Sequence, residues 1–177
     1  FFYKHLYTED GAEILRYLYD RGLSDSDIKR FGLGASPLRG GTLLEYMLDL
    51  GYSHEELKTA GLAVDRAGET RDMFYGRAMF PIIDANGHVL GFGGRAMGSA
   101  MPKYLNTSET PIFNKRQGLY AMNFVRKERP LDHLVLVEGY MDTIQMRKAG
   151  VSGVVATLGT ALTEEQARLM KRYAPEV

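Results

Sequence analysis

Two acidic residues, Glu138 and Asp142, have a type and spacing that could hold a metal ion. Glu138 directly follows the apolar run 134–137, and Gly139 beside it has no side chain to obstruct a ligand. Both carboxylates would face one side of a strand–helix junction if the segment from Gly139 is helical. Mg²⁺ binds one or two protein carboxylates together with phosphate oxygens and water. A second interpretation is as good: Glu138 accepts backbone N–H groups at a helix start, and the helix dipole stabilises Asp142.

Basic and polar side chains in the middle of the chain could bind phosphate. Paired glycines, as in Gly93-Gly94, let backbone N–H groups approach an anion, and an arginine such as Arg95 adds bidentate contacts. Taken alone, this motif fits a β-bulge beside a surface charge better. The segment 101–115 has little regular pattern and is predicted to be a loop. Its polar residues are Lys103, Tyr104, Asn106, Thr107, Ser108 and Lys115. Such loops often bind ligands, but solvated loops of this composition are also common.

The elements that would position these residues follow from the apolar pattern. Residues 134–137 and 153–157 are branched, uncharged runs that predict buried strands, and residues 140–149, closed by Gly150, predict a helix between them. Thr163, with Gln166 three residues on, predicts the N-cap of a further helix. Strand, helix, strand, helix indicates a parallel βαβ unit. Ligands of open parallel sheets bind at the carboxyl ends of strands, where Glu138 falls.

A second supersecondary unit is predicted upstream. Residues 78–83 and 89–92 are apolar runs that flank Asn86-Gly87, a strong hairpin signal. An antiparallel hairpin would bring Arg77, at its start, close to Gly93-Gly94-Arg95, at its exit. The charged run 126–129 before Pro130 is predicted to be a solvated helix end and linker.

The first third of the chain reads as helical scaffold. Ile14, Leu15, Tyr17 and Leu18 predict an amphipathic helix that ends at Arg21-Gly22. Residues 24–27 are predicted to cap a short helix from Ile28, and residues 43–50 and 54–59 predict two more. His5, His54 and His88 lie singly, without metal-ligand spacing.

Composition limits the class of protein. The 177 residues contain no cysteine, which excludes disulfides and cysteine zinc sites. No apolar run approaches the roughly 20 residues of a membrane helix, and no secretory signal opens the chain, so we expect a cytoplasmic protein without membrane contact. Formal net charge is zero, but basic residues outnumber acidic ones six to three between 71 and 116. We expect a polyanion to bind in this region, although an ordinary solvated surface explains so small an excess of basic residues equally well.

Several motifs in a fixed order resemble a known family. Glu138-Gly139-Tyr140-Met141-Asp142, followed by Ala156-Thr157-Leu158-Gly159-Thr160, resembles the first half of a Toprim domain, in the form found in DnaG-type bacterial replicative DNA primases. The upstream motifs that resemble the primase RNA polymerase core are Phe80-Pro81-Ile82, Gly91-Phe92-Gly93-Gly94-Arg95, Pro102-Lys103-Tyr104-Leu105-Asn106, Glu109-Thr110-Pro111 and Phe113-Asn114-Lys115. The resemblance runs from about Ile14 to the end and is loose in the first third.

The resemblance implies an α/β fold. Residues 1–130 would form an α+β amino-terminal subdomain of the primase RNA polymerase core, joined to 131–177, an incomplete parallel Toprim α/β unit. The implied activity is that of a DNA-directed RNA polymerase, a nucleotidyltransferase that makes short RNA primers from NTPs on single-stranded DNA during replication.

The resemblance also implies site residues. Glu138 would hold Mg²⁺ or Mn²⁺, and Asp142, Lys103 and Lys115 would join it in catalysis. The nucleotide and nucleic-acid ligands would be Arg77, Arg95, Lys103, Tyr104, Asn106 and Lys115. Tyr104 could stack on a base or sugar, and a packing role for its ring is equally plausible.

Departures from the family pattern qualify these expectations. Tyr75 stands where the family commonly has a second arginine, two residues before Arg77. The family's metal site also needs an Asp-x-Asp pair after Glu138, and the chain has none there; Asp25-Ser26-Asp27 suits helix capping better. We therefore expect a catalytic-core fragment that is inactive alone. Its zinc-binding module and its contacts with the replicative helicase and single-strand-binding protein would lie in other parts of the primase.

Two other functions fit part of the pattern. A Toprim nuclease or topoisomerase-like enzyme would cut strands, but the phosphate-binding motifs around Lys103 argue against it. A noncatalytic single-strand-binding or replisome-interaction module would bind through the basic middle and be indifferent to Glu138.

Overall fold

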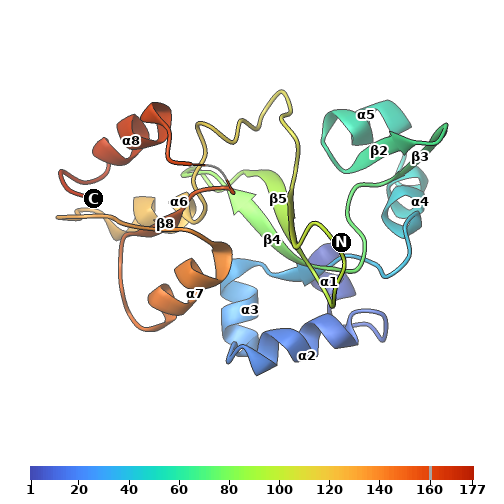
Figure 1. Ribbon diagram of the computed structural model, residues 1–177, viewed down its shortest axis with the longest axis horizontal. Coiled ribbons are helices and arrows are strands. Elements are labelled where there is room, and N and C mark those ends of the chain that lie inside the picture. The colour runs from blue at the N-terminus through green and yellow to red at the C-terminus, as the bar shows by residue number, and fades with distance from the viewer. Residues whose placement is uncertain (160) are drawn as a thin grey trace. The chain divides into compact units, whose positions relative to one another are not determined.

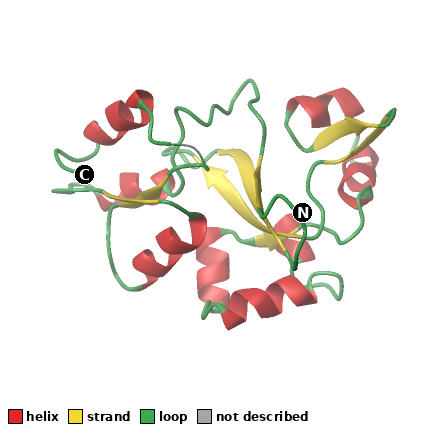
Figure 2. Ribbon diagram, viewed as in Figure 1, coloured by secondary structure: helices red, strands yellow, loops and turns green. Residues whose placement is uncertain are grey.

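A computed structural model of the chain describes residues 1–159 and 161–177 (Figure 1). Its contacts divide the chain into two compact units, each built from two segments. Unit 1 is Phe1–Pro81 with Phe92–Pro111, and unit 2 is Ile82–Gly91 with Ile112–Val177. Helices and strands are interspersed in both (Figure 2). The structure confirms the predicted α/β class.

The helices of unit 1 lie largely where the sequence predicted them. They are α1 (Phe2–His5), α2 (Ala12–Asp20), α3 (Asp25–Phe31), α4 (Thr42–Asp49) and α5 (His54–Thr59). The prediction that α3 begins at Ile28 was wrong by one turn. Ser24 is its N-cap: the Ser24 hydroxyl accepts a hydrogen bond from the Asp27 N–H at 3.3 Å, and Asp27 Oδ2 accepts one from the Ser24 N–H at 2.9 Å. This reciprocal capping satisfies the first N–H groups of the helix, so residues 25–27 are helical.

The strands form two antiparallel groups and one parallel pair. One sheet has the order β1 (Gly34–Ala35), β4 (Arg77–Ile83), β5 (Val89–Ala96) and β6 (Tyr104–Asn106). A separate two-stranded sheet pairs β2 (Ala63–Arg66) with β3 (Glu69–Asp72). Strands β4 and β5 are neighbours joined by the turn 84–88, where the Asp84 N–H donates to the His88 carbonyl at 3.0 Å, as expected for the predicted hairpin.

The prediction that the hairpin brings Arg77 close to Gly93-Gly94-Arg95 is confirmed: these three residues form the second half of β5, and Arg77 Nη1 donates to the Gly94 carbonyl at 3.2 Å. The prediction that 101–115 is a loop was wrong in part. The segment expected to be a loop contains β6, whose Tyr104 pairs with Arg95 and whose Asn106 pairs with Gly93. This pairing gives the backbone groups of both strands partners, which a local pattern could not reveal because it joins segments distant in sequence.

The core of unit 1 is aromatic. Phe2, Leu43, Phe74 and Met79 form a buried cluster, and the Phe2 ring meets the Phe92 ring edge-on at 5.1 Å between centroids. Buried Asp72 closes the start of α4: its carboxylate accepts hydrogen bonds from the N–H groups of Gly41, Leu43 and Leu44 at 2.8, 3.1 and 2.8 Å. A carboxylate there satisfies orphan donors and complements the helix dipole.

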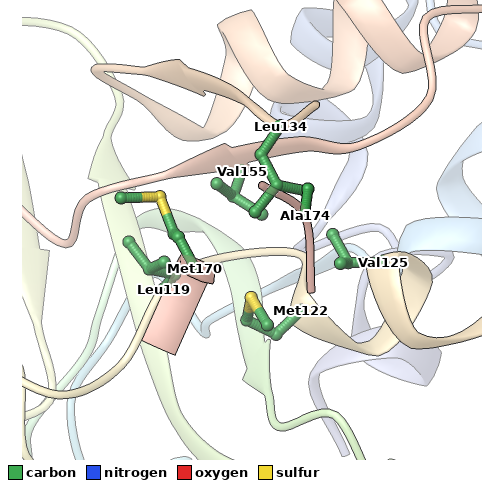
Figure 3. Packing of buried hydrophobic residues seen from close by; sticks show 7 residues of the cluster. All are labelled: Leu119, Met122, Val125, Leu134, Val155, Met170 and Ala174. Atoms are coloured by element: carbon green, nitrogen blue, oxygen red, sulfur yellow. The ribbon is translucent and has the colours of Figure 1, made fainter. Parts of the chain in front are cut away.

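Unit 2 contains the predicted βαβ unit. Strand β7 (Val135–Val137) runs parallel to β8 (Val154–Ala156), with Val135 opposite Val154 and Val137 opposite Ala156. Helix α7 (Tyr140–Lys148) joins them, and α8 (Glu164–Lys171) follows with Thr163 as its N-cap. Figure 3 shows the apolar core behind them: Leu119, Met122, Val125, Leu134, Val155, Met170 and Ala174. Strand β8 is buried, but β7 is only half-buried, so the prediction of two buried strands holds for one.

The predicted linker 126–129 is instead anchored to the βαβ unit. It follows α6 (Met122–Val125) and forms the 3₁₀ turn η1 (Arg126–Glu128). Glu128 accepts hydrogen bonds from the buried Arg147 guanidinium of α7 at 2.7 Å and from the Gly153 N–H at 2.9 Å. Arg147 also donates to the Val154 carbonyl at 2.9 Å. The prediction that this charged run is solvated was wrong, because Glu128 pairs with the buried guanidinium of Arg147, and burial of that arginine could not be foreseen from the local sequence.

In the part of the chain that the structure describes, every helix is too short or too polar to cross a membrane.

Candidate nucleotide and metal site

Glu138 stands at the carboxyl end of β7, in a hollow of about 430 Å³. The hollow is lined by Leu136, Val137, Glu138, Thr157, Gly159, Ala161 and Leu162. Glu138 is exposed, and within the described residues its carboxylate has no hydrogen-bond or ion-pair partner. Thr160, the last residue of the Toprim-like motif, lies outside the described residues. The Glu138 carboxylate is therefore open to a ligand.

Gly139 and Asp142 complete this junction. Gly139 is the N-cap of α7 and has extended backbone, with φ −143°. A Cβ on Gly139 would lie 3.1 Å from Asp142 Oδ2, so glycine leaves the first turn of α7 uncrowded. The capping role weighed for Glu138 is not seen, because the helix start has no side-chain cap.

A divalent cation fits this site only in part. Glu138 offers one exposed carboxylate, and Asp142 is a second exposed acid in the first turn of α7. No cluster of three or more potential ligands occurs within residues 1–159 and 161–177. Since Mg²⁺ also takes phosphate oxygens and water, these residues could contribute one or two of its ligands.

Arg77 lies at the start of β4 in unit 1, and its side chain is buried. Its Nη1 donates to the Gly94 carbonyl at 3.2 Å and to the Pro102 carbonyl at 2.9 Å. Burial lowers the pKa of the guanidinium from its usual value. A Cβ on Gly94 would lie 2.9 Å from both Arg77 Cδ and Phe74 Cδ1, so the glycine is required for packing, not for a special φ. Arg77 thus joins β5 to the segment leading into β6.

Arg95 is held by aromatic rings. Its Cζ lies 4.3 Å from the centroid of the Tyr17 ring of α2, and Tyr104 faces it across the β5–β6 pair. Burial raises the pKa of Tyr104, and the positive charge of Arg95 opposes that rise. Arg95 makes no ion pair within the described residues, and its buried Nε has no hydrogen-bond partner there. Within residues 1–159 and 161–177 the charge of Arg95 therefore has no neutralising carboxylate.

Sequence reasoning did not identify Tyr17 as the ring that contacts Arg95. Its place in an amphipathic helix was recognised, but the helical pattern shows only which face is covered, not which cation lies on it. The family motif around Arg95 contains no signal for a residue so far away in sequence.

The remaining candidates divide between the units. In unit 1, Lys103 is exposed while its carbonyl accepts the Ala96 N–H at 2.8 Å, and Asn106 is half-buried in β6. In unit 2, Lys115 is half-buried in a turn before α6. The structure therefore places four candidates on three neighbouring strands of one sheet, with Lys103 directly before β6; the four are Arg77, Arg95, Tyr104 and Asn106. Lys115, Glu138 and Asp142 belong to the other unit.

Comparisons with known proteins agree on one family. Residues 1–126 match the family described as the DNA primase catalytic core, N-terminal domain, and residues 132–177 match the Toprim domain. The DNA primase of Clostridium acetobutylicum is 44% identical over 177 residues, which cover 100% of this chain and 29% of that protein. The DNA primase of Pseudomonas aeruginosa is 41% identical over 181 residues, covering 99% and 27%.

Solved structures give the same result. The DnaG primase catalytic domain bound to ssDNA superposes with a TM-score of 0.91 at 35% identity, covering 99% of this chain and 57% of that one. The E. coli primase catalytic core gives a TM-score of 0.92 at 35% identity, with the same coverage of 99% and 57%. The chain thus spans less than a third of the curated relatives' length, at 29% and 27%.

Proposed function

Because this chain belongs to the family of DNA primase catalytic cores, we propose that it takes part in template-directed synthesis of RNA primers from NTPs on single-stranded DNA. The observation that carries the proposal is the Glu138 carboxylate, which has no partner within the described residues and lies in a hollow at the carboxyl end of β7. Ligands of parallel α/β sheets bind at this edge. The reaction would join a primer 3′-hydroxyl to the α-phosphorus of an NTP, releasing pyrophosphate and the hydroxyl proton.

Glu138 would hold a divalent cation, Mg²⁺ or Mn²⁺, which when bound would stabilise charge on the attacking and leaving oxygens. Asp142, in the first turn of α7, would orient water ligands of that cation. Lys103 and Lys115 would neutralise phosphate charge, as would Arg95, whose positive charge has no acidic partner within the described residues. Arg77 would contribute to nucleotide binding indirectly, by holding the backbone at Gly94 and Pro102 through hydrogen bonds. Tyr104 and Asn106, on the edge strand β6, would contact template or nucleotide.

The proposal extends to the organisation of the parent protein. We assign residues 1–130 to the amino-terminal subdomain and 131–177 to the Toprim portion, supported by the matches to 1–126 and 132–177. Single-stranded DNA, NTPs and the RNA primer are the proposed ligands, and the cytoplasm the proposed location. Zinc binding and contacts with the replicative helicase and single-strand-binding protein are assigned to other parts of the primase.

The test is primer synthesis by the full-length protein that contains this chain, with Glu138→Gln beside the wild type. We expect the glutamine to lower synthesis by about 100-fold or more, because it removes a metal-binding charge, while single-strand binding stays unchanged. Glu165→Gln is the matched control, since Glu165 is exposed on α8 away from the hollow.

Two results would contradict the proposal. Wild-type synthesis by the Glu138→Gln protein would remove the carboxylate from the mechanism. If the wild type makes no RNA but both proteins bind the strand equally, the chain belongs to a binding module.

A further inference from the structure

In the turn that carries Lys115, Asn114 accepts hydrogen bonds from three backbone N–H groups. The Asn114 side-chain oxygen accepts a hydrogen bond from the Arg116 N–H at 2.9 Å. The Asn114 carbonyl accepts the N–H groups of Gln117 and Gly118 at 3.1 and 3.0 Å. The carbonyl groups of Lys115, Arg116 and Gly118 in this turn accept hydrogen bonds from partners outside it.

Those partners are the first side chains of α8. Gln166 Nε2 donates to the Lys115 carbonyl at 3.0 Å and to the Gly118 carbonyl at 2.8 Å. The Thr163 hydroxyl donates to the Arg116 carbonyl at 2.5 Å. Gln166 is fully buried, with 0% of its surface exposed. Two side chains therefore hold three carbonyls of one turn.

Helix capping does not explain this choice of side chains. Within the capping box, Thr163 Oγ1 accepts the Gln166 N–H at 3.1 Å and Gln166 Oε1 accepts the Thr163 N–H at 3.1 Å. That exchange requires only acceptors, which aspartate and glutamate supply equally and with a charge that the helix N-terminus favours. The amide N–H₂ and the hydroxyl proton are needed only for the turn.

The same stretch of chain connects the turn to the hollow of Glu138. Thr157, Gly159, Ala161 and Leu162 line the hollow, and the chain then enters Thr163 directly. On the turn side, a Cβ on Gly118 would lie 3.3 Å from Leu158 Cδ1, so the turn packs against this stretch. The wall of the hollow and the backbone of Lys115 are thus joined through Thr163 and Gln166.

We infer that Gln166 and Thr163 are positioning residues that fix Lys115 for binding the phosphates of an NTP. The inference rests on the proposed function, because Lys115 is assigned to nucleotide there. A lysine side chain is flexible, and a fixed backbone reduces the entropy lost when its ammonium is ordered on a phosphate. Neither residue would touch the nucleotide.

Two substitutions separate positioning from capping. Gln166→Glu and Thr163→Asp keep the capping acceptors but remove the donors, and each places a carboxylate against carbonyl oxygens of the turn. In the full-length protein we expect the NTP KM in primer synthesis to rise about fivefold or more, with kcat nearly unchanged. Thr163→Ser retains the hydroxyl and should restore the wild-type KM. Gln145→Glu, the same change at an exposed site on α7, is the matched control.

A double substitution tests whether the effect passes through Lys115. With Lys115→Ala, which should itself weaken binding of an NTP in Mg²⁺, adding Gln166→Glu should cause no further loss. Thermal melting of each variant shows whether it folds; if Gln166→Glu does not, Thr163→Asp carries the same comparison.

Unchanged NTP affinity in folded Gln166→Glu and Thr163→Asp proteins would overturn the inference, as would full additivity with Lys115→Ala. Absence of primer synthesis by the wild type would instead overturn the proposed function.

Discussion

At the scale of single residues, the candidate site depends on how its arginines are held. Arg77 is buried among backbone carbonyls, whereas Arg95 lies on the Tyr17 ring without an acidic partner in the described chain. An aromatic face attracts the guanidinium without cancelling its net charge. Arg95 is therefore better suited than Arg77 to meet a phosphate directly.

Removing the Tyr17 ring should weaken binding by Arg95. We expect Tyr17→Leu to lower affinity for single-stranded DNA about twofold to thirtyfold at moderate salt, because a cation–π contact contributes roughly 0.5–2 kcal/mol. Fluorescence anisotropy with a labelled oligonucleotide measures the affinity. Tyr17→Phe keeps the ring and should bind as the wild type does; equal affinity of the leucine and phenylalanine variants would show that the ring does not matter.

Gly94 should tolerate no side chain. Gly94→Ala would place a methyl 2.9 Å from Arg77 Cδ and Phe74 Cδ1, and such overpacking costs about 1–3 kcal/mol of unfolding free energy. Denaturant titration checks this. Gly40→Ala is the control, since a Cβ there meets nothing within 4 Å. Equal stability of the two variants would show that the packing around Gly94 is loose.

At the scale of elements, what could be predicted depended on how local the signal was. The βαβ unit, the cap at Thr163 and the turn 84–88 were predicted from neighbouring residues, and the structure confirms them. The capping segment 24–27 was also predicted, but with the helix start one turn too late. Strand β6 escaped prediction because its partner β5 supplies its hydrogen bonds. The anchoring of residues 126–129 through Glu128 was not predicted either, because Arg147, the partner of Glu128, becomes buried only when α7 packs.

The anchoring of η1 by Glu128 should contribute to stability. We expect Glu128→Gln to lower the unfolding free energy by about 1–3 kcal/mol, because it leaves the buried Arg147 with a weaker acceptor. Glu164→Gln is the matched control, since Glu164 and Arg168 form an exposed pair with side chains 83% and 73% exposed, and should change stability by about 0.5 kcal/mol or less. Equal losses in the two variants would mean that burial adds nothing at Glu128.

At the scale of the whole molecule, the resemblance predicted family and fold class, and the comparisons confirm both. The roles of the site residues remain predictions. The arrangement of the site residues in space could not be derived from the order of the motifs along the sequence, because each unit is formed by two segments that are separated in sequence.

The chain alone should not make primers. Within its described residues no cluster of three acidic or histidine side chains occurs, so we expect the 177-residue protein to show no template-dependent RNA synthesis with Mg²⁺ and NTPs. The full-length protein serves as the positive control in the same assay. Synthesis by the 177-residue chain would show that Glu138 and Asp142 suffice as protein carboxylates.

The interleaving of the two units has a consequence for synthesis on the ribosome. All of unit 1 has been made once residue 111 is added, but the hairpin tip, Ile82–Gly91, belongs with residues not yet translated. At about 5–20 residues per second, residues 112–177 take roughly 3–13 s. During those seconds unit 1 can fold while Ile82 and Leu90 wait uncovered for Leu119 and Met122, with which they line a pocket in the finished unit. The nascent chain therefore presents a short apolar hairpin that a ribosome-associated chaperone could hold.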